Sequence, residues 1–263
     1  MIKRELKVNL KSFIIWTSIL IIMFLVVFLV YPFMITDDTV NSLDEMMKVF
    51  PPELLKTFNM DITSINTAYG WLKSEGFMFV LIAVGVYSSI MGANILYKEE
   101  KDKTIEYLSF LPIKRSSILT NKIIVSIIYI ISMILVLGIF NYIALALSCE
   151  FESKEFIYLS ITPLLIAMPL FSINLFISTF LHKTKKTFGY SLGLVFIFYM
   201  FNVISELSDK VEFMKYFSIY ALSDIRNVIA NGYINSINVI LSFIISLIFI
   251  IFSYIKYNKK ELL

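Results

Sequence analysis

The sequence is poor in the residue types that metal and catalytic sites require. Its 263 residues include a single histidine, His182, and a single cysteine, Cys149. One histidine leaves too few ligands for a metal-dependent site, because such sites group three or four ligands. One cysteine excludes a disulfide within the chain and does not indicate the redox compartment. No glycine is followed by lysine, so the sequence lacks the P-loop, whose backbone amides and lysine hold the phosphates of ATP.

Charge is also missing from six long stretches of the chain. A helix of about 20 residues crosses the roughly 30 Å hydrocarbon core of a bilayer. With 58% apolar residues, the composition is too apolar for a soluble globular protein. The sequence therefore predicts an all-α polytopic membrane protein with six transmembrane helices, which form a single domain over residues 1–263. The stretches without Asp, Glu, Lys, Arg or His are residues 13–34, 76–97, 123–148, 156–181, 187–204 and 236–255.

The distribution of basic residues predicts how these spans are oriented. Six spans place both termini on one side, and that side carries 16 of the 23 Lys and Arg residues but only 6 of the 20 carboxylates. Basic residues resist translocation, whereas acidic residues matter little. Both termini and the connection 98–122 are therefore expected in the cytoplasm, with 35–75 and 205–235 outside. The fourth span carries Pro163 and Pro169 and is expected to kink.

Two segments outside the spans show a helical pattern. At the amino terminus, Ile2, Leu6 and Leu10 fall on one face among basic residues. This pattern favours an interfacial elbow helix in the lipid headgroup layer, with an irregular basic tail as the alternative. Before the last span, an apolar stripe predicts an external amphipathic or re-entrant helix that Gly232 would end. The stripe consists of Phe217, Ala221, Ile225, Val228 and Ile229.

The connection 98–122 is the only long one on the predicted cytoplasmic side. Its charges lie at its two ends, residues 105–111 are mostly apolar, and Pro112 ends a helix there. An apolar helix held at the membrane face by charged flanks can dock into a groove of a partner protein. The same pattern also fits an interfacial helix that lies on lipid. The residue types alone leave both interpretations open.

This connection resembles a sequence pattern of a known transporter family. Glu99 and Glu100 are followed by TIEYL at 104–108 and LPIKR at 111–115. The run is similar to the stretch E…GT-[IL]-E-x-L-x-x-x-P-[VI]-x-R that follows the second span in type 2 permeases of ATP-binding-cassette transporters. Lys103 departs from the glycine that commonly precedes the threonine. The resemblance extends over nearly the whole chain, through the elbow, the six spans, the external helical segment and the basic carboxyl end.

The resemblance implies a permease subunit of an exporter in the cell membrane. In that family a coupling helix within this connection contacts a separate nucleotide-binding subunit. MgATP would therefore bind to the partner, and this chain would be neither an enzyme nor a cofactor-binding protein. A second permease chain, identical or different, would complete the transporter in the lipid bilayer, with no nucleic-acid partner. The residues that the resemblance assigns to the ATPase contact are Glu106, Tyr107, Leu108, Phe110, Leu111, Pro112, Lys114 and Arg115.

Two other functions stay open on the residues alone: an ion-coupled carrier or channel-like protein, and a membrane scaffold without transport activity. Ion-coupled carriers usually need ionisable groups inside the membrane to bind and release the coupling ion. The six predicted spans have none, which disfavours a proton antiporter, although backbone carbonyls could still hold Na⁺. Apolar spans with scattered asparagines suit lipids, peptide antibiotics, drugs or Na⁺ alike, so the substrate is left open.

Uncharged polar and small residues are the remaining features of the spans. Gly85 with Ser89, and Ser88 with Gly92, form two small-xxx-small pairs in the second span. Such pairs favour close helix packing, including packing across a dimer. Four asparagines lie in four different spans, where they form interhelical hydrogen bonds worth about 0.6 kcal/mol each or line a translocation path. They are Asn94, Asn141, Asn174 and Asn202.

Overall fold

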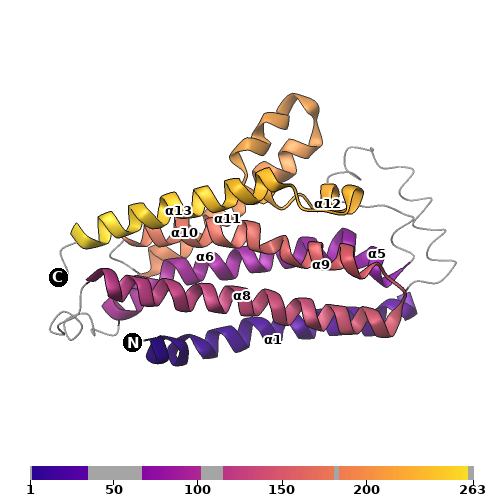
Figure 1. The fold of residues 1–263 in the computed structure, drawn as a ribbon, viewed down its shortest axis with the longest axis horizontal. Helices are drawn as coiled ribbons and strands as arrows, with labels where there is room; N and C mark the ends of the chain where they lie inside the picture. The colour runs from indigo at the N-terminus through magenta and orange to yellow at the C-terminus, as the bar shows by residue number, and fades with distance from the viewer. Residues whose placement is uncertain (1, 35–66, 102–114, 181–183, 260–263) are drawn as a thin grey trace.

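The computed structural model describes residues 2–34, 67–101, 115–180 and 184–259. All regular structure in these residues is helical, which confirms the predicted all-α class. Figure 1 shows the long helices running side by side, with the two chain termini at the same end of the bundle. Residues 35–66 and 102–114, which contain most of the predicted external loop and of the predicted coupling helix, lie outside the described residues.

Six segments of the described chain are long and apolar enough to cross a membrane, which confirms the predicted number of spans. A short helix, α5 (Ala68–Trp71), and a π-helical turn, η1 (Leu72–Gly76), lead into the second of them. One span combines two helices, α9 (Ser153–Ile161) and α10 (Pro163–Ser178). The other five are α1 (Ile2–Met34), α6 (Phe77–Lys101), α8 (Arg115–Ser148), α11 (Thr184–Leu207) and α13 (Ser236–Lys259).

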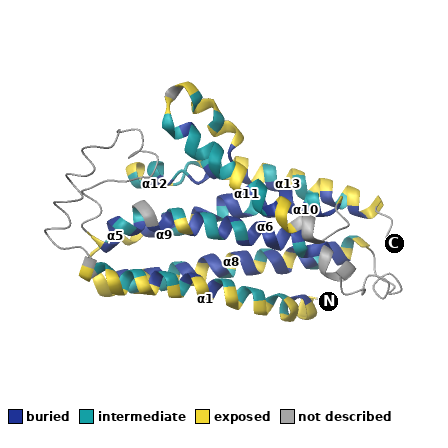
Figure 2. Ribbon diagram, turned by 180° about the vertical axis from the view of Figure 1, so that it is seen from behind, coloured by how far each residue is buried: buried dark blue, intermediate teal, exposed yellow. Residues whose placement is uncertain are grey.

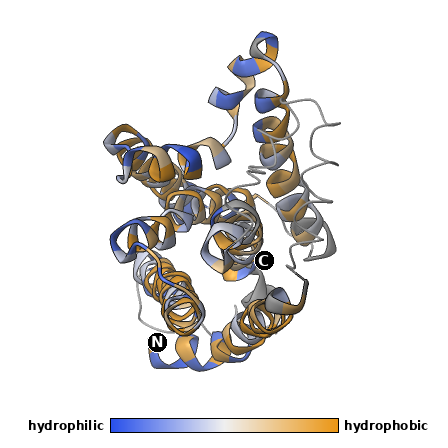
Figure 3. Ribbon diagram, turned by 90° about the vertical axis from the view of Figure 1, so that its right-hand side faces the viewer, coloured by the Kyte–Doolittle hydropathy of each residue, from blue (hydrophilic) through white to orange (hydrophobic). Residues whose placement is uncertain are grey.

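The helices α6 and α10 form the centre of the bundle. In the most apolar window of each span, 72% of α6 and 67% of α9–α10 are buried inside the chain, against 17% for α1, α11 and α13. Figure 2 shows this contrast as dark blue on α6 and α10 and yellow along α1. Figure 3, which looks along the bundle, shows hydrophobic residues in orange over much of the long helices. Exposed apolar faces of this kind are expected where lipid surrounds a protein.

Two glycines allow α6 to approach its neighbours closely. A Cβ atom at Gly92 would clash with the backbone oxygen of Phe171 and lie 3.0 Å from the amide nitrogen of Leu175 in α10. A Cβ atom at Gly85 would clash with the hydroxyl group of Tyr220. The predicted close packing of this span is confirmed, and the structure places it within the chain, chiefly against α10.

The fourth span is interrupted at Pro163, one of the two prolines at which a kink is expected, where α9 meets α10. Proline has no N–H group, so Pro163 cannot donate to the carbonyl oxygen of Leu159. That oxygen accepts a 2.8 Å hydrogen bond from the hydroxyl group of Thr162 instead. Pro163 then begins α10, a position where a missing N–H costs little. Pro169, in contrast, stays inside α10.

The predicted elbow is not a separate helix in this structure. The helix α1 runs without interruption from Ile2 to Met34, so Leu6 and Leu10 belong to the first turns of the first span. Neither glycine nor proline occurs before Pro32, so no residue in this segment strongly opposes a continuous helix. The basic residues of these turns are exposed on the helix surface.

The segment between α11 and α13 consists of three short pieces rather than one amphipathic helix. They are two 3-10 helices, η2 (Asp209–Phe217) and η3 (Tyr220–Leu222), and α12 (Ile225–Asn231). Figure 1 shows η2 folding back along the end of α11, so that the two project from the bundle.

A serine explains why the expected single helix is not formed. The hydroxyl group of Ser218 donates to the carbonyl oxygen of Phe198 and accepts from the N–H of Tyr220, which breaks the helical pattern after Phe217. As a result, Phe217 is 64% exposed whereas Val228 is buried. The predicted stop is confirmed, because Gly232 ends α12 in the left-handed conformation with φ 68°.

Candidate functional site

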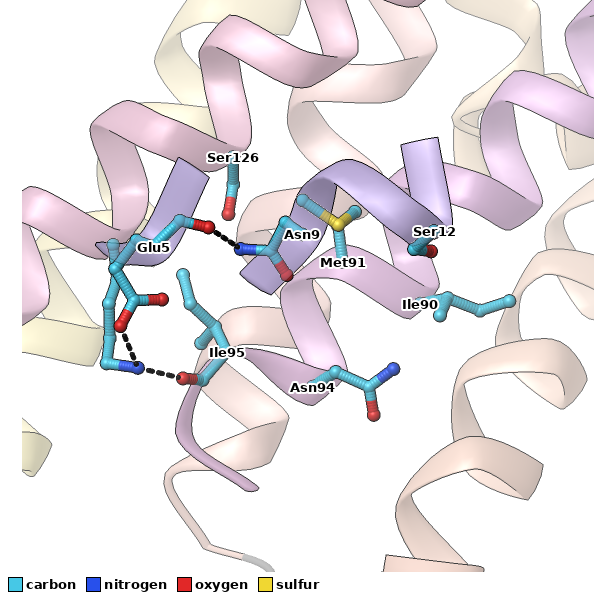
Figure 4. Close-up of a pocket in the computed structure, with 9 residues that line it drawn as sticks. Glu5, Asn9, Ser12, Ile90, Met91, Asn94, Ile95 and Ser126 are labelled. Carbon is cyan, nitrogen blue, oxygen red and sulfur yellow. Dashed lines mark hydrogen bonds and ion pairs between the residues drawn. The ribbon is translucent and has the colours of Figure 1, made fainter. Parts of the chain in front are cut away.

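A polar cavity lies between α1, α6 and α8, near the end of the bundle where the chain begins (Figure 4). Its volume is about 100 Å³. Its lining brings together a carboxylate, an ammonium group, amides and hydroxyl groups, a combination that usually marks function inside a membrane bundle. The lining residues are Glu5, Asn9 and Ser12 of α1, Ile90, Met91, Asn94 and Ile95 of α6, and Lys122 and Ser126 of α8.

A buried ion pair forms part of the cavity wall. The Nζ atom of Lys122 lies 3.5 Å from Oε1 of Glu5 and donates a 2.9 Å hydrogen bond to the carbonyl oxygen of Ile95. Figure 4 draws both contacts as dashed lines. Lys122 is 3% exposed and Glu5 is 7% exposed, so protein groups and the polar cavity, rather than bulk solvent, surround the two charges. Lys122 therefore joins α1, α6 and α8 at one point.

The structure places Lys122, the last residue of the predicted cytoplasmic connection 98–122, inside a helix. The helix α8 begins at Arg115, so Lys122 lies two turns inside it. Leu119, Lys122 and Ser126 are all buried, and their spacing of three and four residues puts them on one helix face. That spacing was the available signal in the sequence. The charge-free stretch begins only at Ile123, so the absence of charge alone does not indicate this buried face.

The amino-terminal half of α8 also holds two other helices. Tyr129 donates a 2.5 Å hydrogen bond to the carbonyl oxygen of Leu6 in α1. Thr120 and Tyr254 of α13 share a hydrogen bond of 2.7 Å between their hydroxyl groups. Tyr129 follows Lys122 by seven residues, so both side chains face α1. This part of α8 is therefore a connecting element for α1, α6 and α13.

The four asparagines of the spans do not share one site. Asn94 lines the polar cavity. Asn141 is buried and, with Ser160, lines a second and much smaller cavity near the α9–α10 junction. Asn174 donates to a backbone carbonyl of its own helix at 2.8 Å, and Asn202 donates to a carboxylate of its own helix at 3.1 Å. Of the four, Asn94 is the one that the structure places in the polar cavity.

Of the residues predicted to contact an ATPase, the structure describes one. Arg115 is the first residue of α8 and is exposed. The helix α6 ends at Lys101, so the segment between these residues connects two helices that line the polar cavity. The remaining predicted contact residues lie outside the described part of the chain; they are Glu106, Tyr107, Leu108, Phe110, Leu111, Pro112 and Lys114.

A second, partly buried ion pair lies toward the opposite end of the bundle. Lys73 of η1 forms a 2.9 Å contact with Glu155 of α9, and its Nζ atom lies 4.8 Å from the ring centre of Tyr69. Burial, and then the nearby Glu155 carboxylate, raise the pKa of Tyr69. These contacts tie the turn before α6 to α9. Within the described residues, no group of three or more His, Cys, Asp or Glu side chains could hold a metal ion.

Comparison with protein families gives a match over nearly the whole chain. A family model described as ABC-2 family transporter protein matches residues 1–262. No curated protein and no solved structure matches the chain. The family match includes all six spans and the connection between α6 and α8.

Proposed function

The chain belongs to the ABC-2 transporter family, and from this premise we propose that it is the permease subunit of an ATP-binding-cassette exporter. Two permease chains, identical or different, form the membrane part of the transporter. A separate ATPase subunit hydrolyses MgATP and drives a substrate outward. The family match supports this assignment most strongly. The absence of a glycine–lysine sequence from the chain supports placing ATP hydrolysis in the partner.

Both termini lie on the cytoplasmic side of the cell membrane in this proposal. The start of α1, the end of α6, the start of α8 and the end of α13 lie at one end of the bundle (Figure 1). The segments expected on that side carry 16 of the 23 basic residues. The positive-inside rule places an end of this kind in the cytoplasm.

The segment 102–114 is proposed to contact the ATPase subunit and to pass its movement to the spans. Because it connects α6 to α8, a force on it acts first on the ends of these two helices. The helix α6 is the most buried span, and it packs tightly against α10. Movement at the end of α6 can therefore reach the centre of the bundle, since closely packed helices transmit displacement.

The test is whether an ATPase associates with the chain in its native membrane. An affinity-tagged chain is purified in mild detergent, and the copurifying proteins are identified by mass spectrometry. We expect a P-loop ATPase in stoichiometric amount. The complex should hydrolyse MgATP, and substitution of the partner's P-loop lysine should stop hydrolysis while leaving the complex intact. The chain purified alone should bind no radiolabelled ATP.

A carrier or channel would behave differently in the same preparation. No ATPase would copurify with the tagged chain. In liposomes, the chain alone would take up radiolabelled Na⁺ in response to an imposed Na⁺ gradient, or would carry an ion current. That pair of results would contradict the exporter proposal and establish the alternative.

A further inference from the structure

The two helices that flank residues 102–114 are joined by a buried lysine. Lys122 of α8 donates a 2.9 Å hydrogen bond to the carbonyl oxygen of Ile95 in α6. Ile95 lies six residues before α6 ends at Lys101, and Lys122 lies seven residues after α8 begins at Arg115. The contact between α6 and α8 is otherwise small compared with the contact between α6 and α10. The hydrogen bond of Lys122 therefore adds to a limited packing contact between these two helices.

The same ammonium group also holds the start of α1. Its distance to Oε1 of Glu5 is 3.5 Å, and both residues are almost fully buried. Charges that face each other away from water attract more strongly than a surface pair, because solvent and salt screen them less. On the next residue of α1, the carbonyl oxygen of Leu6 accepts a 2.5 Å hydrogen bond from Tyr129. The first turns of α1 are thus attached to α8 at two successive residues.

We propose that Lys122 is a positioning residue, which makes the adjoining ends of α1, α6 and α8 move as one body when the segment 102–114 is displaced. The inference rests on the proposed function, in which a partner ATPase acts on that segment. A lysine suits this role because its ammonium group has three donors and can bond a carbonyl oxygen and pair with a carboxylate at once. An apolar side chain of similar length fills the space without linking the three helices.

The opposite end of the molecule provides a matched control. Lys73 and Glu155 also form a partly buried ion pair, at 2.9 Å. This pair joins η1 to α9, far from the helix ends that flank the segment 102–114 (Figure 1). A general loss of stability should follow from breaking either pair, but a loss of linked movement should follow only from breaking the pair that contains Lys122.

The experiment measures whether α1 and α6 keep their distance during the ATPase cycle. In a Cys149→Ser background, spin labels are attached through Val8→Cys in α1, a position with 45% exposure, and through Lys101→Cys at the last residue of α6. Pulsed EPR on the complex with its ATPase gives the distance distribution without nucleotide and with MgATP and vanadate. With Lys122 present, we expect the same mean distance in both conditions. With Lys122→Met, the mean should shift on nucleotide trapping by more than the width of the nucleotide-free distribution.

Three further variants keep the inference open to contradiction. Lys122→Arg keeps the charge and the donors and should retain the unchanged distance, while Lys73→Met should do the same despite its broken ion pair. Glu5→Gln keeps the side-chain size but removes the charge that pairs with Lys122. It should therefore produce the same shift in mean distance on nucleotide trapping, and it tests the inference even if Lys122→Met does not fold. A nucleotide-dependent shift with Lys122 present, or no shift in both Glu5→Gln and Lys122→Met, would overturn the inference. If no ATPase copurifies with the parent protein, the proposed function is overturned instead. The purification gives this result before any distance is measured.

Discussion

The hydroxyl group of Ser242 in α13 donates a 2.8 Å hydrogen bond to the carbonyl oxygen of Leu165 in α10. In an uninterrupted helix that oxygen would accept from the N–H of residue 169, but Pro169 has no N–H. Ser242 is 4% exposed, so the bond is shielded from the surroundings of the bundle. The last span thus completes the backbone hydrogen bonding that a proline leaves incomplete in a central helix, as membrane proteins require.

Ser242→Ala should destabilise the protein by about 1 kcal/mol, because it leaves the Leu165 oxygen buried without its donor. Ser246→Ala is the matched control, since Ser246 donates to the Ser242 carbonyl within its own helix and should cost less. Thermal unfolding in detergent compares the two variants. Adding Pro169→Ala to Ser242→Ala restores an N–H at position 169 and should recover part of the loss. Equal losses from the two serine substitutions would contradict this account.

Gly92→Ala should destabilise the protein by roughly 1–3 kcal/mol, the usual cost of adding atoms to a closely packed interior. The added methyl group would meet the backbone of Phe171, which cannot move aside as a side chain can. Gly189→Ala is the control, because a Cβ atom at Gly189 in α11 has no neighbour within 4 Å. It should be neutral or stabilising, since alanine favours a helix over glycine. The measurement is the change in unfolding temperature relative to the parent protein, in the same detergent. Gly92→Ala should lower this temperature clearly, and Gly189→Ala should leave it unchanged or raise it.

The number and order of the spans were predictable from charge alone, because an unpaired charge is too costly to bury in hydrocarbon. The partners of Lys122 were not predictable in this way. Its counter-charge, Glu5, lies 117 residues earlier in the sequence, and nothing in the local sequence of α8 indicates the pairing. Spacing placed Lys122 on the buried helix face, but only the fold brings Glu5 and Ile95 to it. The candidate site was therefore predictable only through Asn94, one of its lining residues.

The last span shows a second limit of hydropathy. It was expected to be free of charge over residues 236–255, and in the structure it belongs to the helix Ser236–Lys259. Its buried residues, however, are Ser242, Ser246, Ser253 and Tyr257. Lipid is as apolar as a protein core, so apolar residues do not tell the inner face of a membrane helix from the outer one, whereas small polar residues often do. The serine spacing of four and seven residues was the informative signal.

The Glu5–Lys122 pair should be strongly coupled in unfolding experiments. Lys122→Met alone should cost about 3–5 kcal/mol, because it leaves the Glu5 carboxylate buried without a counter-charge. Glu5→Gln in the same protein removes that charge, so the double variant should be more stable than the sum of the single losses predicts. Denaturant unfolding of the four proteins measures the coupling. Additive losses would show that the two side chains do not depend on each other.

Cysteine labelling in intact cells should show which side of the membrane each connection occupies. In a Cys149→Ser background, Ser42→Cys should react with a membrane-impermeant maleimide, and Ser116→Cys should react only after the cells are opened. The expectation follows from the excess of basic residues on the side of Ser116. Labelling of Ser116→Cys but not Ser42→Cys in intact cells would reverse the proposed topology and remove the segment 102–114 from reach of a cytoplasmic ATPase.

Phe110→Ala and Leu111→Asp should each weaken the complex with the ATPase subunit while leaving the permease in the membrane. Aromatic and apolar anchors at the centre of an interface commonly contribute about 2 kcal/mol or more, which is roughly thirtyfold in Kd. Phe213→Ala is the matched control, because Phe213 is an exposed phenylalanine of η2 (59% exposed) in the proposed external segment. Copurification of the ATPase with each tagged variant gives the comparison. Normal recovery of the ATPase with both Phe110→Ala and Leu111→Asp would place the interface elsewhere, and loss with Phe213→Ala alone would place it on the opposite face of the membrane.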